Sequence, residues 1–270
     1  MAPEHDHIEE PSNEELRLLS RRSAIKSLGG AGLAVIAACA TSSAVTTTAA
    51  AAGSTTSSGA TATTAGGGTT ITTFGGAGSV LIPEETAGPY PLDLSGDEVF
   101  VRTDITEGRP GVPLALTLTL VNASADCAPI ANARVDLWHC DTDGVYSGYS
   151  QPGSDTTGET FCRGIQVTDG NGQVTFQTIY PGWYQGRITH IHFQVFLDNG
   201  LAATSQIAFP PEVTDAVYVV EPYAAKGANT PVPTYADDNL FSDGTQYQLA
   251  AATGDPVSGY AASLLVGMEV

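Results

Sequence analysis

Two histidines, His190 and His192, are spaced so that one β-strand could present both to the same metal ion. In residues 190–197, apolar side chains such as Ile191 and Phe193 alternate with more polar ones. Side chains along a strand point alternately to its two faces, so the two imidazoles would share one face and the apolar residues the other. A His-x-His pair alone is more often an ordinary surface or hydrogen-bonded pair, so the neighbouring residues must decide.

Two tyrosines and an arginine accompany this pair. Tyr184 follows a Pro-Gly turn, Arg187 lies three residues before His190, and Tyr146 follows a glycine-containing turn at the end of a predicted strand. Singly, each has an ordinary explanation: a tyrosine hydrogen-bonded at a strand end, or an arginine paired with a carboxylate. Their significance depends on whether they occur together in a recognisable order.

The order of the sequence motifs that contain these residues resembles that of the intradiol aromatic-ring dioxygenases, in particular their exported branch. Residues 83–90 resemble the family's entry motif, 138–146 contain the first tyrosine, 161–192 resemble the central block, and 204–210 resemble the following strand. The resemblance extends over residues 83–241. Several ordered blocks with compatible gaps make a far more specific signal than one short motif.

The resemblance implies one non-haem ferric ion in this domain. It assigns Tyr146 and Tyr184 as the equatorial and axial tyrosinates, and His190 and His192 as the axial and equatorial imidazoles. A phenol normally ionises near pH ~10, but a hard trivalent cation favours the phenolate strongly enough to bind it deprotonated. Two phenolates stabilise the ferric state, and two neutral imidazoles complete the protein's share of the ligands.

The resemblance also implies a reaction. A catechol would bind as a dianion and displace the catalytic Tyr184, whose phenolate can accept a proton. One oxygen atom of dioxygen would then be inserted between the two hydroxylated carbons, and the other would enter in the hydrolysis that gives a cis,cis-muconate-type diacid. Arg187 corresponds to a catalytic arginine that stabilises negative charge beside the ring, and Gln206 to a glutamine of the substrate pocket.

Two departures from the family pattern leave the substrate and the oligomeric state open. The gap between Tyr184 and Arg187 is shorter than in the best-known soluble enzymes. The N-terminal helical region through which many catechol 1,2-dioxygenases dimerise is replaced by other sequence. Two alternatives remain: the same ligands acting on another phenolic or lignin-derived compound, or a β-sandwich that binds aromatic, glycan or protein partners and keeps a structural metal.

The elements expected to position these residues are short strands. Residues 114–120 alternate strictly between leucine and small or polar residues, and 133–138 and 174–179 are further strand candidates separated by Gly, Asn and Asp turns. No sustained helical period occurs after residue 80. The pattern predicts an antiparallel β-sandwich over residues 81–270, of the prealbumin-like type that the resemblance implies.

The first 80 residues predict export and tethering. Arg21 and Arg22 precede a short apolar run in a pattern typical of a twin-arginine signal over residues 1–40. Cys39 ends a lipobox-like sequence, which favours acylation and a membrane tether over ordinary cleavage at the same place. Residues 41–80, rich in Ala, Ser, Thr and Gly, are expected to be a flexible linker.

Charge and cysteine content add further constraints. The net charge of −19 makes nucleic acid an improbable partner. In an oxidising compartment Cys127 and Cys140, which flank one predicted strand, are the preferred disulfide, although either pairing with Cys162 stays open. His139 is expected to be structural. The carboxylates of residues 84, 85, 141 and 143 are expected to be solvated in loops.

Overall fold

The computed structural model describes residues 81–198 and 200–270. The predicted signal sequence, Cys39 and the predicted linker lie outside the described residues. Within them, no helix is long and apolar enough to cross a membrane.

The first sheet is built around the leucine-rich strand β1. Its strands are β1 (Pro113–Asn122), β2 (Ala128–Pro129), β7 (Gln173–Ile179), β10 (Ala251–Asp255) and β11 (Gly259–Met268). Strand β1 pairs with β11 on one edge and with β7 and β2 on the other, and β10 extends the sheet beyond β11. Alternate residues of β1 are buried, as the strict leucine alternation predicts.

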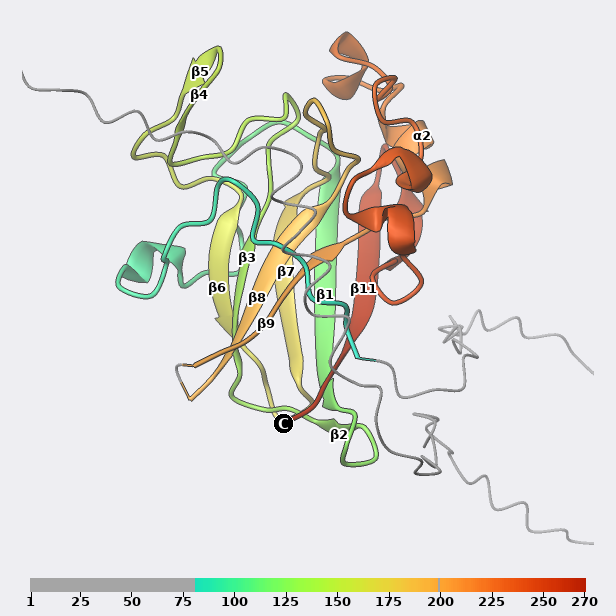
Figure 1. The fold of residues 1–270 in the computed structure, drawn as a ribbon. Coiled ribbons are helices and arrows are strands. Elements are labelled where there is room, and N and C mark those ends of the chain that lie inside the picture. Colours follow the sequence, from blue (N-terminus) through green and yellow to red (C-terminus); the bar gives the residue numbers. More distant parts are fainter. Residues whose placement is uncertain (1–80, 199) are drawn as a thin grey trace, which may run out of the picture.

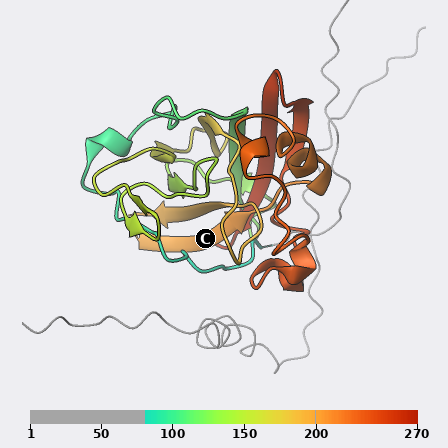
Figure 2. The same ribbon diagram turned by 90° about the horizontal axis from the view of Figure 1, so that it is seen from above.

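The second sheet carries residues whose side chains could take part in chemistry. It contains β3 (Arg134–Trp138), β6 (Arg163–Val167), β8 (Ile191–Leu197) and β9 (Gly200–Ile207), all antiparallel, in the order β6-β3-β8-β9. A small hairpin of β4 (Ser150–Gln151) and β5 (Ser154–Asp155) stands apart. Figures 1 and 2 show the two larger sheets as the two layers of a sandwich.

Short helices lie outside the two sheets. The η2 turn (Glu98–Phe100) precedes β1. Between β9 and β10 the chain makes an excursion over residues 208–250, which lies beside β11 in Figure 1. The elements of this excursion are α2 (Pro211–Val217), η3 (Tyr223–Ala225), η4 (Tyr235–Asp237) and η5 (Phe241–Asp243).

One core fills the space between the sheets, with Leu116 and Phe176 from the first and Leu137 and Phe193 from the second. The β-sandwich is confirmed, and the predicted strands are present. One strand pair departs from the predicted antiparallel arrangement, because β1 and β11 run parallel. More than a hundred residues separate these two strands, so no tight hairpin imposes the antiparallel direction on them.

Candidate metal centre

The two faces of β8 divide as the alternating sequence predicts. Ile191 and Phe193 belong to the core between the sheets, whereas His192 is on the opposite, outer face, paired across the sheet with Trp138 of β3 and with Gln206 of β9. The outer face is nevertheless closed to solvent at this point, because His192 is only 1% exposed.

The cover over the outer face is the extended segment of residues 82–92, called here the strap, which crosses in front of β8 and β9 in Figure 1. Its backbone is tied to β9: Glu85 N donates to Thr204 O, and the Ser205 hydroxyl donates to Pro83 O. At Gly88 the backbone has φ +72°, and a Cβ there would lie 2.9 Å from Cε1 of His192. Any side chain at this position would therefore push against the imidazole.

Four potential ligand atoms converge beside β8. Nε2 of His190 lies 3.1 Å from Nε2 of His192, 3.3 Å from the hydroxyl of Tyr184 and 3.4 Å from the hydroxyl of Tyr146. The structure thus brings together all four residues that the resemblance assigns as ligands. No three His, Cys, Asp or Glu side chains form a metal-binding group within the described residues, so the two tyrosines are needed to complete the set.

The ring nitrogens of His190 are arranged as a metal ligand requires, and both imidazoles are neutral. Nδ1 of His190 lies 2.6 Å from Ile188 O, and a carbonyl can only accept, so Nδ1 carries the proton and the Nε2 lone pair faces the cluster. Burial, and then the positive charge of Arg187, hold the pKa of His190 well below its usual value. Burial also lowers the pKa of His192 strongly. Two neutral imidazoles whose Nε2 atoms lie 3.1 Å apart fit a bound cation.

The two phenols differ in accessibility. Tyr146 is buried, and its ring packs at 5.0 Å from that of Tyr90. Burial, followed by the proximity of Tyr184, raises the pKa of Tyr146 well above its usual value. Burial raises the pKa of the partly buried Tyr184 to about 12, against the opposing effect of Arg187. Both phenols are therefore protonated at neutral pH unless a cation binds and stabilises the phenolates.

Packing fixes the orientation of His192. The indole of Trp138 stacks on it with a centroid separation of 5.1 Å and an interplanar angle of 2°. Trp138 and Gly88 thus hold the imidazole from two directions. The sequence alone predicts neither contact, although Gly88 lies in the motif of residues 83–90.

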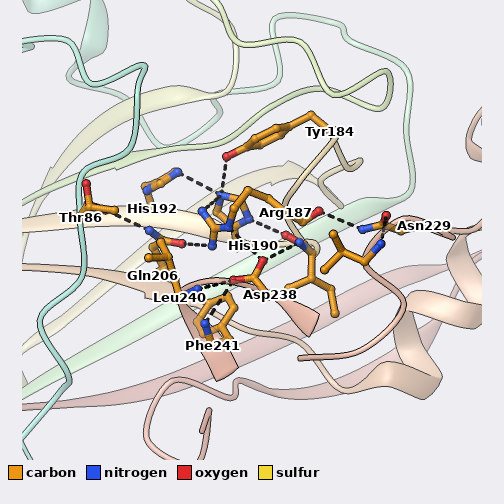
Figure 3. A network of polar contacts seen from close by, with 12 residues as sticks. Thr86, Tyr184, Arg187, His190, His192, Gln206, Asn229, Asp238, Leu240 and Phe241 are labelled. Atoms are coloured by element: carbon orange, nitrogen blue, oxygen red, sulfur yellow. Dashed lines mark hydrogen bonds and ion pairs between the residues drawn. The ribbon is translucent and has the colours of Figure 1, made fainter. Parts of the chain in front are cut away.

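Arg187 lies beside Tyr184, His190 and His192, as Figure 3 shows. Its NH1 is 3.4 Å from Nε2 of His190, its NH2 donates to Gln206 Oε1 at 2.6 Å, and its Nε donates to Asp238 Oδ2 at 2.9 Å. Gln206 in turn donates from Nε2 to Thr86 O of the strap. Gln206 therefore contacts Arg187 directly, and Asp238 is a site residue that sequence reasoning missed.

His139 has the structural environment expected of it. Its Nδ1 donates to Cys140 O at 2.7 Å, and its Nε2 accepts from the Thr178 hydroxyl at 2.7 Å. Burial lowers its pKa to about 4, so the ring is neutral.

The predicted disulfide between Cys127 and Cys140 is wrong. Cys140 and Cys162 are both free, buried thiols, which also excludes the alternative pairings with Cys162. Cys140 packs in the cluster of Trp138 and Tyr146, whereas Cys162 belongs to a separate cluster. Cys127 is itself disulfide-bonded, but to neither of these two thiols.

Comparison with known proteins supports the same family. A family model described as "Dioxygenase" matches residues 93–225. The crystal structure of an intradiol ring-cleavage dioxygenase from Tetranychus urticae is 29% identical and superposes with a TM-score of 0.63, covering 70% of this chain and 95% of that one. A further dioxygenase crystal structure is 28% identical, with a TM-score of 0.61 over 70% of this chain and 94% of the other.

Two curated bacterial enzymes are also similar. The catechol 1,2-dioxygenase of Acinetobacter baylyi is 30% identical over 147 residues, which are 46% of this chain and 45% of that enzyme. A chlorocatechol 1,2-dioxygenase from a Pseudomonas species is 31% identical over 102 residues, 31% of this chain and 39% of that enzyme. The chain thus spans less than half the length of these relatives.

The sandwich, the tyrosine and histidine cluster and these similarities define a mostly β-sheet protein with the intradiol dioxygenase fold. The chain belongs to the intradiol ring-cleavage dioxygenase family. Members of this family typically use non-haem ferric iron and act on catechols with dioxygen.

Proposed function

We propose that this protein uses one ferric ion to cleave a catechol-type ring between its two hydroxylated carbons, giving a muconate-type diacid. The observation that carries the proposal is the convergence of four ligand atoms, with the two tyrosine hydroxyls and Nε2 of His192 all within 3.4 Å of Nε2 of His190. Tyr146, Tyr184, His190 and His192 would hold the ion. The chemistry that ferric iron supplies when bound is the withdrawal of electron density from a catecholate, which opens a ring carbon to dioxygen.

Tyr184 is suited to take a proton from the substrate. It is the more accessible of the two tyrosines, and its pKa in this environment is about 12. A Tyr184 phenolate displaced by an incoming catechol would therefore take up a proton at its hydroxyl oxygen at neutral pH. Tyr146 is buried and packed against Tyr90, so it is suited to stay in place throughout.

Arg187 is suited to stabilise negative charge on the substrate. Its NH1 points at the ligand cluster, and the guanidinium is held there by its contacts with Gln206 and Asp238. A fixed cation at this place lowers the energy of charge that develops on the ring during reaction without having to reorganise. The strap at Gly88 and the stacked Trp138 cover His192, which is only 1% exposed.

The test is a measurement of metal content and dioxygen uptake. Purified protein is assayed for iron and incubated with a panel of catechols, hydroxyquinols and lignin-derived diphenols while dioxygen is followed. We expect about one iron per chain, a red to burgundy colour from tyrosinate-to-iron charge transfer, and uptake of dioxygen with at least one diphenol. Colourless protein with stoichiometric zinc contradicts the iron site, and iron-loaded protein that consumes no dioxygen favours a binding module with a structural metal.

A further inference from the structure

Asp238 is a fully buried carboxylate whose oxygens are all occupied by N–H donors. It follows η4, in the excursion between β9 and β10, and its side chain has no exposed surface. Oδ2 accepts from Arg187 Nε at 2.9 Å and from Ile188 N at 2.8 Å. Oδ1 accepts from the backbone N–H groups of Leu240 at 2.9 Å and Phe241 at 3.1 Å. Four donors and no solvent hold this carboxylate rigidly in one orientation.

The contacts of Arg187 divide its guanidinium into two anchored nitrogens and one that faces the metal ligands. Nε is anchored on Asp238, NH2 on Gln206, and NH1 faces Nε2 of His190 at 3.4 Å. The side chain is 12% exposed. The Asn229 amide, from the same excursion as Asp238, also donates to Arg187 O. Because a guanidinium is planar, two anchors at different nitrogens determine where the third one points.

We propose that Asp238 is a positioning residue of the active site, which acts through Arg187 by fixing the direction of NH1 toward a bound catechol. The inference rests on the proposed function for its substrate. Gln206 supplies the second anchor but no charge, whereas Asp238 forms an ion pair with the buried cation. Residue 238 lies beyond residues 93–225 that match the family model, so a segment outside that match completes the site.

Asp238 also supports its own turn, and the variants must separate that role from the contact with Arg187. In Asp238→Asn, the side chain keeps its shape but loses its charge. Its amide NH2 group then faces one of the two pairs of N–H donors that the carboxylate oxygens accept from. In Asp238→Ser, a short hydroxyl can still accept from the turn N–H groups of Leu240 and Phe241, as serine commonly does in such turns, but cannot reach Arg187. Asp237→Asn is the matched control, since Asp237 is exposed and accepts from the Thr234 hydroxyl.

The activity test is a double-mutant cycle with Arg187→Ala. We expect Asp238→Asn and Asp238→Ser to retain iron and its visible absorption and to lower kcat/KM for the best diphenol on the order of 10- to 100-fold. In the Arg187→Ala background the same substitutions should lower kcat/KM further by less than about twofold, because the side chain that Asp238 positions is gone. Asp237→Asn should behave as wild type. Equal losses in both backgrounds, or wild-type kinetics of Asp238→Ser, would overturn the inference.

A second readout is independent of catalysis. In 15N-arginine-labelled protein without substrate, the Nε–H of Arg187 should be protected from hydrogen exchange because it is buried on Asp238. Asp238→Ser should accelerate this exchange roughly tenfold or more, and Asp237→Asn should not. If wild-type protein cleaves no diphenol, the proposed function fails while this measurement still tests the positioning. An unchanged exchange rate in Asp238→Ser would show that Asp238 does not hold Arg187.

Discussion

The two faces of strand β8 are almost equally buried, yet they are buried for different reasons. Phe193 on the inner face has no exposed surface, because the opposite sheet packs on it. His192 on the outer face is 1% exposed, because the strap lies over it with Gly88 against the ring and Trp138 stacks beside it.

Because the two faces of β8 are buried by different neighbours, burial alone does not describe a residue's role in this protein. Apolar side chains on the inner face gain stability simply by leaving water. The imidazoles on the outer face lose hydration and need partners: Nδ1 of His190 has Ile188 O, but the buried Nδ1 of His192 has no hydrogen-bond partner. The inner face of β8 therefore stabilises the fold, and the outer face is organised for a ligand.

Single substitutions on the two faces of β8 should give the largest effects and test directly whether the faces have different roles. His192→Ala should abolish iron binding, because it removes one of four ligands, while most of the core packing remains. Phe193→Ala should lower the free energy of unfolding by about 3–5 kcal/mol through the cavity it leaves. Iron content and denaturant unfolding of the metal-free proteins measure the two effects separately. The comparison fails if both variants lose iron and stability to the same extent.

The two tyrosines of the site are expected to differ in their roles. Tyr146→Phe removes the buried phenolate that is expected to stay bound, so iron retention should fall strongly. Tyr184→Phe removes the accessible one that catechol would displace, so iron should be retained better and catechol should still bind, while turnover slows because the proton acceptor is lost. Metal content and visible spectra with and without catechol distinguish them. Identical behaviour of the two variants would contradict these roles.

Arg187→Ala should separate metal binding from turnover. No ligand atom is removed, so the iron and its colour should remain, while kcat/KM should fall on the order of 10²-fold or more because a fixed positive charge is lost. Steady-state kinetics and the absorption spectrum of the same preparation provide the measurement. Turnover at the wild-type rate would rule out the proposed role of Arg187.

The smallest expected effect concerns Glu85 on the strap. Contrary to the expectation of a solvated carboxylate, it is partly buried, and burial raises its pKa from 4.5 to about 7. The folded state therefore holds this proton between pH 4.5 and 7 while the unfolded state releases it, so its stabilising contribution is present below pH 4.5 and lost as the pH rises through 7. Glu85→Gln, which resembles the protonated form, should raise Tm relative to wild type by a few degrees at pH 8 and by less at pH 5.

The matched control for Glu85→Gln is Glu84→Gln, which removes the same charge from the exposed neighbouring position. Thermal unfolding of all three proteins at both pH values is the measurement. A Glu85→Gln effect that is the same at pH 5 and pH 8 would show that the carboxyl does not titrate as described.

Local patterns predicted the parts of the fold that depend on neighbouring residues. The alternation in residues 114–120 and 190–197 predicted strands with one apolar face, and the ordered motifs predicted which tyrosines and histidines belong together. Local patterns did not predict the parallel pairing of β1 with β11, because strand direction depends on the path of the intervening chain. They also gave the wrong cysteine pairing: Cys140 is a free thiol, buried with Trp138 and Tyr146.

The amino-acid sequence by itself determined the chemical types of the site: two phenols and two imidazoles near turns and on one strand face, with an arginine three residues before the first histidine. Only the tertiary structure decided which distant residues hold them in place. Asp238 reaches Arg187 from 51 residues further along the chain, and Gly88 reaches His192 from more than a hundred residues earlier. Such contacts leave no periodic trace in the sequence, because a single carboxylate or glycine acquires its role from the packing around it.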